Sequence, residues 1–308
     1  MSKQLNIIGE LINNAYARAR RAWADRNLEG FQNLAKVQTN LGARYLTLNI
    51  DGTSTMQVKQ EEMLDFLPTL VPALQQATST PISFDNPAVE FHRVGLSHYD
   101  RTKSPAPILN SLAASRDQLD EMIDLVREFD TRVIVIASEK FTEHGGSEAC
   151  LKAEDVHQTA AYFVDRLKSE AARTNDDIII DPGLAPVGAD TYGLINVGLD
   201  GMQLIRQDAE LHGCHMMVGL SNFAWGTPKH ARHQLENAYL TLAMENGLDY
   251  ALANPEKAPR PLEATSNLVA KLRAALEEGR PSQGVTQEEA GYDQAEAIMD
   301  ICDDLEQA

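Results

Sequence analysis

The chain has 308 residues, 43% of them hydrophobic, and its 27 Lys and Arg against 45 Asp and Glu give a formal net charge of −18. This acidic balance disfavours nucleic acid and anionic membranes as partners. Apolar runs stay shorter than the roughly 18 residues of a membrane helix, and the first residues lack the pattern of a signal peptide. Three scattered cysteines, Cys150, Cys214 and Cys302, do not form a disulfide framework. We therefore expect a cytoplasmic protein.

Short apolar runs alternate along the chain with longer segments of helical periodicity. The predicted strands are 5–8, 45–48, 81–84, 107–109, 132–136, 177–180, 215–218 and 249–251. Helical spacing of apolar residues is found at 57–77, 115–129, 154–173, 190–212 and 228–247. This order predicts an α/β protein, a single (β/α)8 TIM barrel. A doubly wound open sheet is the alternative, although neither G-x-G-x-x-G nor G-x-x-x-x-G-K-[ST] is present.

The composition of the sequence changes near residue 254. Residues 1–254 form the predicted barrel, and 255–308 form a C-terminal helical, acidic extension, packed on the barrel or at a dimer interface. From Glu277 to the C terminus, ten acidic residues stand against one basic residue. Helices are expected near 263–278 and over 286–306. The last one is predicted to pack through an apolar stripe at helical spacing, which comprises Ala295, Ile298, Met299, Cys302 and Leu305.

Acidic and amide side chains follow most of the predicted strands, with almost no Lys, Arg or His among them. In a β/α barrel these positions lie at the C-terminal mouth. Carboxylates accept N–H bonds and amides both donate and accept, so this set suits a neutral heterocycle such as a 2-amino-4-oxo pterin edge. Each residue alone is better explained as a turn former or a helix N-cap. The convergence of six favours a site: Glu10, Asn49, Asp85, Asn110, Asp181 and Asn222.

Ordered motifs run along the whole barrel. They are IIGELIN at 7–13, PISFDNP at 81–87, PILNS at 107–111, IIIDPG at 178–183 and VGLSNFAWGTP at 218–228. Together they resemble the pterin-binding (dihydropteroate synthase-like) barrel superfamily, and within it the methyltetrahydrofolate/corrinoid methyltransferases. The opening Gly-Glu-Leu-Ile-Asn departs from the family's Gly-Glu-Arg-Ile-Asn, so Leu11 removes a cation.

The resemblance implies roles for individual residues. Asp85, Asn110 and Asp181 match the residues that hold the pterin ring in that family. Asn222 matches the family's asparagine near pterin N5, and we expect it to be catalytic by stabilising charge at that nitrogen. The full expected pterin-binding set is Glu10, Asn49, Asp85, Asn110, Asp181, Gly219, Ser221 and Asn222.

The expected activity is methyl transfer between a methylated corrinoid (cobalamin) protein and N5 of tetrahydrofolate. The chain would then be the second methyltransferase of a corrinoid-dependent demethylase system that gives 5-methyltetrahydrofolate, and the family implies a homodimer. One alternative is a non-catalytic pterin-binding or corrinoid-docking subunit, and another is a metal-dependent barrel lyase. A third is dihydropteroate synthase-type condensation, which needs a Ser-Arg-Lys type cation cluster where this chain has Ser221-Asn222-Phe223.

We expect no metal to be bound by this chain, and the corrinoid to be carried on a partner protein. His212, Cys214 and His215 precede a strand, which places them on the bottom face of the barrel, away from the mouth. His157 is expected on a helix surface. The anionic glutamate tail of the folate has Lys140, Lys229 or Arg101 as candidate cations, none of them fixed by the sequence.

Overall fold

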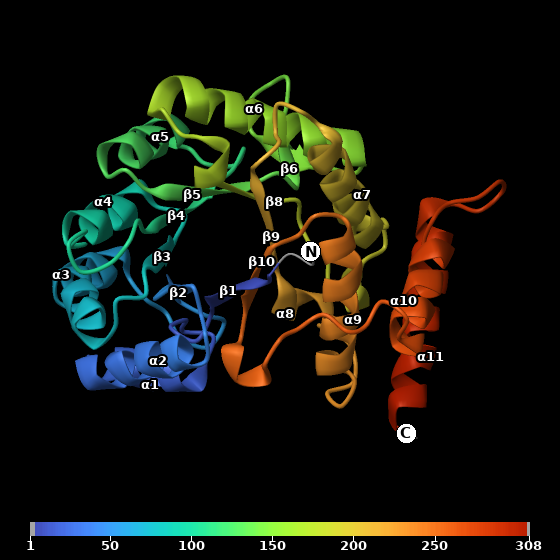
Figure 1. The fold of residues 1–308 in the computed structure, drawn as a ribbon, viewed down its shortest axis with the longest axis horizontal. Helices are drawn as coiled ribbons and strands as arrows, with labels where there is room; N and C mark the ends of the chain where they lie inside the picture. Colours follow the sequence, from blue (N-terminus) through green and yellow to red (C-terminus); the bar gives the residue numbers. More distant parts are fainter. Residues whose placement is uncertain (1–3, 307–308) are drawn as a thin grey trace.

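The computed structural model describes residues 4–306 and has a closed barrel of eight parallel strands at its centre (Figure 1). Around the barrel the order is β1-β10-β9-β8-β5-β4-β3-β2, with β2 returning to β1. The strands are β1 (Asn6–Gly9), β2 (Tyr45–Leu48), β3 (Ile82–Asp85), β4 (Ile108–Leu112), β5 (Arg132–Ile136), β8 (Ile178–Asp181), β9 (His215–Gly219) and β10 (Tyr250–Ala253). The predicted TIM barrel is confirmed, and the open doubly wound sheet is excluded.

Helices surround the barrel and connect consecutive strands (Figure 1). They are α1 (Ala17–Ala24), α2 (Leu28–Asn40), α3 (Gln60–Ala77), α4 (Val89–Ser97), α5 (Leu119–Glu128), α6 (Ala153–Ala171), α7 (Leu194–Gln207) and α9 (Arg232–Glu245). A single short turn of helix, α8 (Leu220–Phe223), directly follows β9. Three 3-10 turns complete the barrel: η1 (Asn175–Asp177), η2 (Val187–Ala189) and η3 (Pro255–Lys257). None of the helices over residues 4–306 has the length and hydropathy that a membrane crossing requires.

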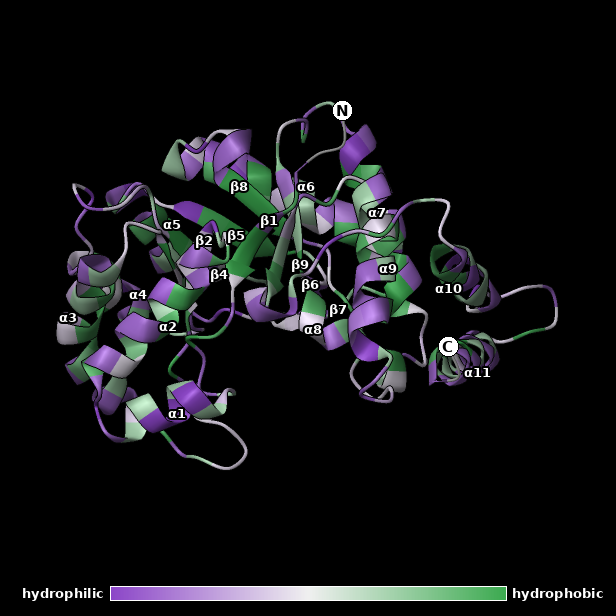
Figure 2. Cartoon of the chain, turned by 60° about the horizontal axis from the view of Figure 1, so that its bottom comes forward, coloured by the Kyte–Doolittle hydropathy of each residue, from purple (hydrophilic) through white to green (hydrophobic). Residues whose placement is uncertain are grey.

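The strands are apolar on both faces because each face is buried. One set of side chains fills the barrel interior: Ile8, Tyr45, Ile108, Ile134, Ile179, Met217 and Tyr250. The alternate residues pack outward against the helices, and Figure 2 shows largely hydrophobic strands surrounded by helices that contain both hydrophobic and hydrophilic residues. At the bottom, the Arg132 guanidinium donates to the hydroxyls of Tyr45 (3.2 Å) and Tyr250 (2.9 Å). These contacts close the floor, so a ligand must enter at the other end.

A β-hairpin is inserted after β5. Its strands β6 (Glu139–Phe141) and β7 (Ser147–Ala149) are antiparallel. The turn between them contains Gly145 and Gly146, both with positive φ (84° and 92°), a region that side chains disfavour. The hairpin follows the C-terminal end of β5, so it lies at the mouth of the barrel, beside the ends of β5 and β8.

The C-terminal extension is a helical hairpin that packs beside α7 and α9 (Figure 1). It comprises α10 (Asn267–Glu278) and α11 (Gln287–Glu306). The Asn196 amide of α7 donates to the Leu276 carbonyl at 2.7 Å, and the Arg280 guanidinium holds the Asp200 carboxylate through two bonds of 2.7 and 2.9 Å. The hairpin is thus tied to the barrel by both buried amide contacts and ion pairs.

The apolar stripe of α11 is shifted from the predicted one. Ile298 and Cys302 are buried and Ala295 and Leu305 half-buried, but Met299 is 38% exposed, so its predicted place in the stripe is wrong. A neighbour in sequence lies about 100° away around a helix, and here the buried face continues through other residues. Those additional buried positions are Ala290, Gly291, Gln294 and Ile301.

Truncation of the barrel interior should destabilise the fold. Ile134 is 1% exposed at the centre of the interior cluster, so Ile134→Ala should lower the free energy of unfolding by about 2–5 kcal/mol. Leu41→Ala is the control, because Leu41 is 52% exposed and its truncation should cost less than about 0.5 kcal/mol. Urea unfolding followed by circular dichroism measures both, and equal small losses would contradict the assigned core.

Candidate functional site

The C-terminal ends of the strands bring the predicted polar residues to one mouth. Asp85 and Asn110 are cross-strand neighbours at the ends of β3 and β4, and Asp181 ends β8. Glu10 follows β1, and the loop after β9 contributes Ser221 and Asn222. The predicted site residues therefore lie around one opening, on the face opposite the Arg132 floor.

Asp85 is one of two half-buried aspartates at the mouth that keep a carboxylate oxygen unbonded by the described residues. The Asn49 amide donates to Asp85 Oδ2 at 3.2 Å, and Oδ1 accepts no bond from the described residues. Burial raises the pKa of Asp85 to about 6; the Asn49 bond opposes this rise and the nearby Asp51 carboxylate adds to it. At neutral pH this carboxylate is ionised, but at a desolvation cost that a hydrogen-bond donor would offset.

Asp181 has a similar environment. It accepts one bond, from the Gly183 N–H at 2.9 Å, and its other oxygen has no partner within residues 4–306. Gly183 has φ +89°, and a Cβ there would lie 2.5 Å from the Ser138 Cβ, so glycine is required for this turn. Burial raises the pKa of Asp181 to about 6. The fully buried Tyr239 hydroxyl, also without a partner in the described chain, lies in the field of this carboxylate.

The amides of the mouth differ in how they are held. Asn110 is buried, and its Nδ2 makes a long 3.4 Å bond to Ser83 Oγ, while its side-chain Oδ1 has no partner among the described residues. Asn222 is exposed and its side chain makes no hydrogen bond within residues 4–306. A Cβ at Gly219 would lie 2.9 Å from Asn222 Nδ2, the end of an exposed side chain. Glycine at this position therefore leaves room for the Asn222 amide.

Several polar residues of the mouth were missed by the sequence reasoning. Asp51 accepts a bond from the Asn86 amide, and burial raises its pKa. The Arg116 guanidinium donates to Ser111 O (3.0 Å) and Ser111 Oγ (3.1 Å) and lies near Asp85 and Glu139. These residues lie in loops beyond the strand ends, so strand patterns do not identify them. Arg116 supplies a cation beside a mouth predicted to hold almost none.

The other half of the mouth is a cluster of buried carboxylates. Glu10 is 5% exposed, and its two oxygens accept from the hydroxyls of Tyr16 and Ser221, the latter at 3.1 Å. Glu236 of α9 is buried nearby and faces Lys257 Nζ at 3.8 Å. Burial raises the pKa of both carboxyl groups, although the two hydroxyl bonds oppose this at Glu10. Glu10 thus has both carboxylate oxygens occupied by protein donors.

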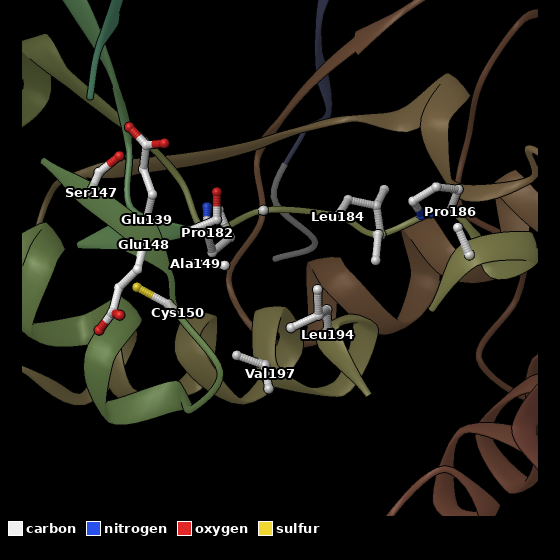
Figure 3. A pocket seen from close by; sticks show the side chains of 14 residues that line it. Glu139, Ser147, Glu148, Ala149, Cys150, Pro182, Leu184, Pro186, Leu194 and Val197 are labelled. Carbon is white, nitrogen blue, oxygen red and sulfur yellow. The ribbon is translucent and has the colours of Figure 1, made fainter. Parts of the chain in front are cut away.

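A cavity of about 580 Å³ adjoins this mouth between the β6–β7 hairpin and the segment after β8 (Figure 3). In Figure 3, Glu139 and Glu148 lie on the hairpin side, and Leu184, Leu194 and Val197 form the opposite apolar wall. Pro182 and Gly183 connect the cavity to Asp181. The cavity therefore lies beside Asp181 at the mouth of the barrel.

Within residues 4–306, no group of three or more His, Cys, Asp or Glu side chains is arranged to hold a metal ion. His215, at the start of β9, bonds Asp249 through Nδ1 (2.7 Å) and Asp176 through Nε2 (3.1 Å) at the bottom of the barrel. His157 lies on α6 with its Nε2 2.7 Å from the Asp208 carboxylate. Each of these imidazoles is thus engaged by carboxylates.

The fold is shared with solved dihydropteroate synthases. The Vibrio fischeri enzyme superposes with a TM-score of 0.60 at 15% identity, over 90% of this chain and 95% of that one. The Clostridium difficile enzyme, solved in the presence of pteroic acid, gives 0.61 at 16% identity over 82% and 91%. The Coxiella burnetii enzyme, solved in complex with pteroic acid, gives 0.55 at 18% over 81% and 87%. No family model matches the chain.

These similarities establish the fold. They confirm the (β/α)8 barrel that the sequence predicted. At such identities they do not transfer an activity.

Replacing Asp181 by Asn should stabilise the free protein at neutral pH. In the folded protein the pKa of Asp181 is about 6, above its ordinary value of 3.8. The contribution of the Asp181 carboxyl to the free energy of unfolding is therefore fully present below pH 4 and is lost as the pH rises through 6. Asp181→Asn keeps an acceptor for Gly183 and should raise the free energy of unfolding at pH 8 by about 1–3 kcal/mol, with no gain at pH 3.5.

Urea unfolding at the two pH values measures this effect. Asp300→Asn on the exposed face of α11 is the control and should change stability by less than about 0.5 kcal/mol at pH 8. A destabilised Asp181→Asn variant at pH 8 would contradict the desolvation of this carboxylate.

Proposed function

We propose that the chain is a methyltransferase that moves a methyl group between a methylated corrinoid protein and N5 of tetrahydrofolate. The observation that supports it is the set of unused acceptors at the mouth. Asp85 and Asp181 each keep an oxygen with no partner among the described residues, and Asn110 keeps its side-chain Oδ1 unbonded. Such acceptors match the N–H groups along the 2-amino-4-oxo edge of a reduced pterin.

In this proposal the carboxylates bind and orient the ring. Asp85 and Asp181 are partly desolvated, so a hydrogen bond from a ligand N–H is stronger there than in water. Asn110 adds an amide that accepts from the same edge. Two further hydrogen bonds fix side chains around the ring. Asn49 donates to Asp85, and Ser221 donates to Glu10.

Methyl transfer requires positioning and charge stabilisation at one nitrogen. An in-line displacement at a methyl carbon needs no covalent bond to the protein, so correct placement supplies much of the rate. Asn222 is exposed at the mouth with its amide free, which suits a hydrogen bond to N5 as its charge changes. A partner that brings a methylated cobalt to N5 has access from the same side.

The proposed partners follow from this reaction. The corrinoid is a substrate group delivered by a second protein, since we assign no corrinoid site to this chain. We further propose a cytoplasmic homodimer that gives 5-methyltetrahydrofolate as the second methyltransferase of a corrinoid-dependent demethylase system. The acidic hairpin α10–α11 is the part of the chain proposed to extend the dimer contact.

A condensation of the dihydropteroate synthase type is the second candidate, favoured by the shared fold. That reaction must hold a pyrophosphate leaving group, for which bidentate arginines are suited. Here Ser221 is bonded to Glu10, Lys257 faces Glu236 and Arg116 is bonded to Ser111. An anion at the mouth would meet these carboxylates, so the electrostatics favours methyl transfer.

The two candidates separate in a direct assay. Purified protein with methylcobalamin and tetrahydrofolate should lose the methylcobalamin absorbance only when tetrahydrofolate is present. A separate incubation with hydroxymethyldihydropterin pyrophosphate and p-aminobenzoate should give no dihydropteroate. Folate binding without turnover would indicate a non-catalytic pterin-binding or corrinoid-docking subunit, and dihydropteroate formation would establish the second candidate.

Loss of the Asn222 amide should affect the rate far more than binding. Asn222→Ala removes a bond that strengthens as charge changes at N5, so kcat should fall by about 100-fold while the Kd for tetrahydrofolate changes by less than about threefold. Steady-state demethylation and calorimetry measure the two quantities. Asn175→Ala, at the bottom of the barrel, is the control and should alter neither. Equal losses in rate and affinity would remove the catalytic role of Asn222.

A further inference from the structure

We infer that Glu10 receives, through the hydroxyl of Ser221, the proton that N5 of the folate loses when it is methylated. The inference rests on the proposed function and assigns a task that the ring-binding residues leave open. Asp85 and Asp181 bind the opposite, pyrimidine edge of the ring in that proposal. Asn222, the residue placed at N5, has an amide that does not accept a proton at neutral pH.

The geometry places a proton acceptor one residue from Asn222. Ser221 and Asn222 are consecutive in α8, and Ser221 is half-buried at the mouth. Ser221 Oγ donates to Glu10 Oε2 at 3.1 Å, and the Tyr16 hydroxyl donates to the other oxygen. Glu10 accepts both bonds, which is the pattern of an ionised carboxylate. The Ser221 hydrogen bond therefore leads from the mouth to a buried base, while the Tyr16 bond holds the other oxygen of that base.

The charges around Glu10 keep it easy to protonate. Glu10 is 5% exposed, which disfavours its ionised form. On α9, Glu236 adds a second buried negative charge, while Lys257 of η3 is the cation that faces both acids. The remaining groups on the packed elements are the hydroxyls of Tyr16 and Ser221, with Arg232 near Glu236 and the Arg18–Glu256 ion pair at the rim.

The proton and electrons balance without a further reactant. The N5 electron pair forms the new nitrogen–carbon bond, and the cobalt–carbon bond breaks with its pair remaining on the cobalt of the partner. The methylated nitrogen still carries its original proton and is cationic. That proton passes to Ser221 Oγ as the hydroxyl proton passes to Glu10, which leaves neutral 5-methyltetrahydrofolate and a protonated carboxyl. In the reverse direction the same groups protonate N5 before the methyl group leaves.

This arrangement also explains why the two halves of the mouth differ. The ring-binding carboxylates Asp85 and Asp181 keep free oxygens for a ligand, whereas both oxygens of Glu10 are occupied by hydroxyl groups. A residue so enclosed cannot bind the ring directly, but it can exchange protons through the serine that bonds it. Glu10 is therefore a positioning and proton-relay residue, since it acts on the substrate through Ser221.

Glu10→Gln tests the relay because the amide keeps the shape of the side chain and cannot take the proton. At saturating tetrahydrofolate with methylcobalamin as donor, kcat should fall at least about tenfold at pH 7.5, with the Kd for tetrahydrofolate unchanged within about threefold. Wild-type kcat should also decrease as pH falls through the pKa of Glu10, and this acid limb should be absent in the variant. Circular dichroism and the thermal midpoint establish that the variant is folded.

Glu236→Gln is the matched control. It removes a buried like charge beside Glu10 and leaves the relay intact, so the acid limb of kcat should move to lower pH while the plateau rate at high pH is retained. Ser221→Ala should reproduce the loss seen for Glu10→Gln, because it interrupts the same chain.

The outcomes separate the relay from the proposed function. If wild-type protein is active and Glu10→Gln retains both the wild-type kcat and its acid limb, the relay is wrong and methyl transfer stands. If Glu10→Gln and Glu236→Gln change the pH profile of kcat identically, Glu10 is not the proton acceptor and the relay is again wrong. If the wild-type protein neither binds tetrahydrofolate nor demethylates methylcobalamin, the proposed function itself fails.

Discussion

The desolvation of carboxylates at the open end of an apolar barrel is the constraint on which the rest of the site depends. Asp85 and Asp181 end strands whose other residues are almost entirely hydrophobic, so both lie where the charged form is disfavoured. Each accepts a single protein hydrogen bond and keeps one oxygen unused. A neutral group with several N–H donors would satisfy them without introducing a net charge.

The remaining carboxylates of the mouth are handled differently. Glu10 is enclosed by hydroxyl groups, and Glu236 faces Lys257. The barrel thus separates acids that are open to a ligand from acids that are engaged by the protein. This division comes from topology, because the open acids end β3 and β8 while the enclosed ones face α8, α9 and η3. In the proposed reaction, this division lets one scaffold both bind a flat ring and take up a proton.

The strands and the gathering of polar residues at the mouth were predictable from the sequence because local rules determine them. Parallel strands buried on both faces appear as short apolar runs, and residues at their C-terminal ends must meet at the mouth. Arg116, Tyr16 and Glu236 were not predictable in this way, since their positions depend on how loops and helices pack after the barrel closes. Met299 shows the same limit: helical spacing identified a stripe in α11, but the docking angle of the hairpin decided which residues it buried.

The most direct measurement is calorimetric titration of tetrahydrofolate into the protein at pH 6, in phosphate and in Bis-Tris, two buffers with different ionisation enthalpies. Near their pKa, Asp85 and Asp181 are partly protonated in the free protein and become ionised when the ring donates to them. The account predicts binding with release of about one proton at pH 6 and almost none at pH 8. Absence of binding heat, or an apparent enthalpy at pH 6 that is the same in both buffers, would contradict it.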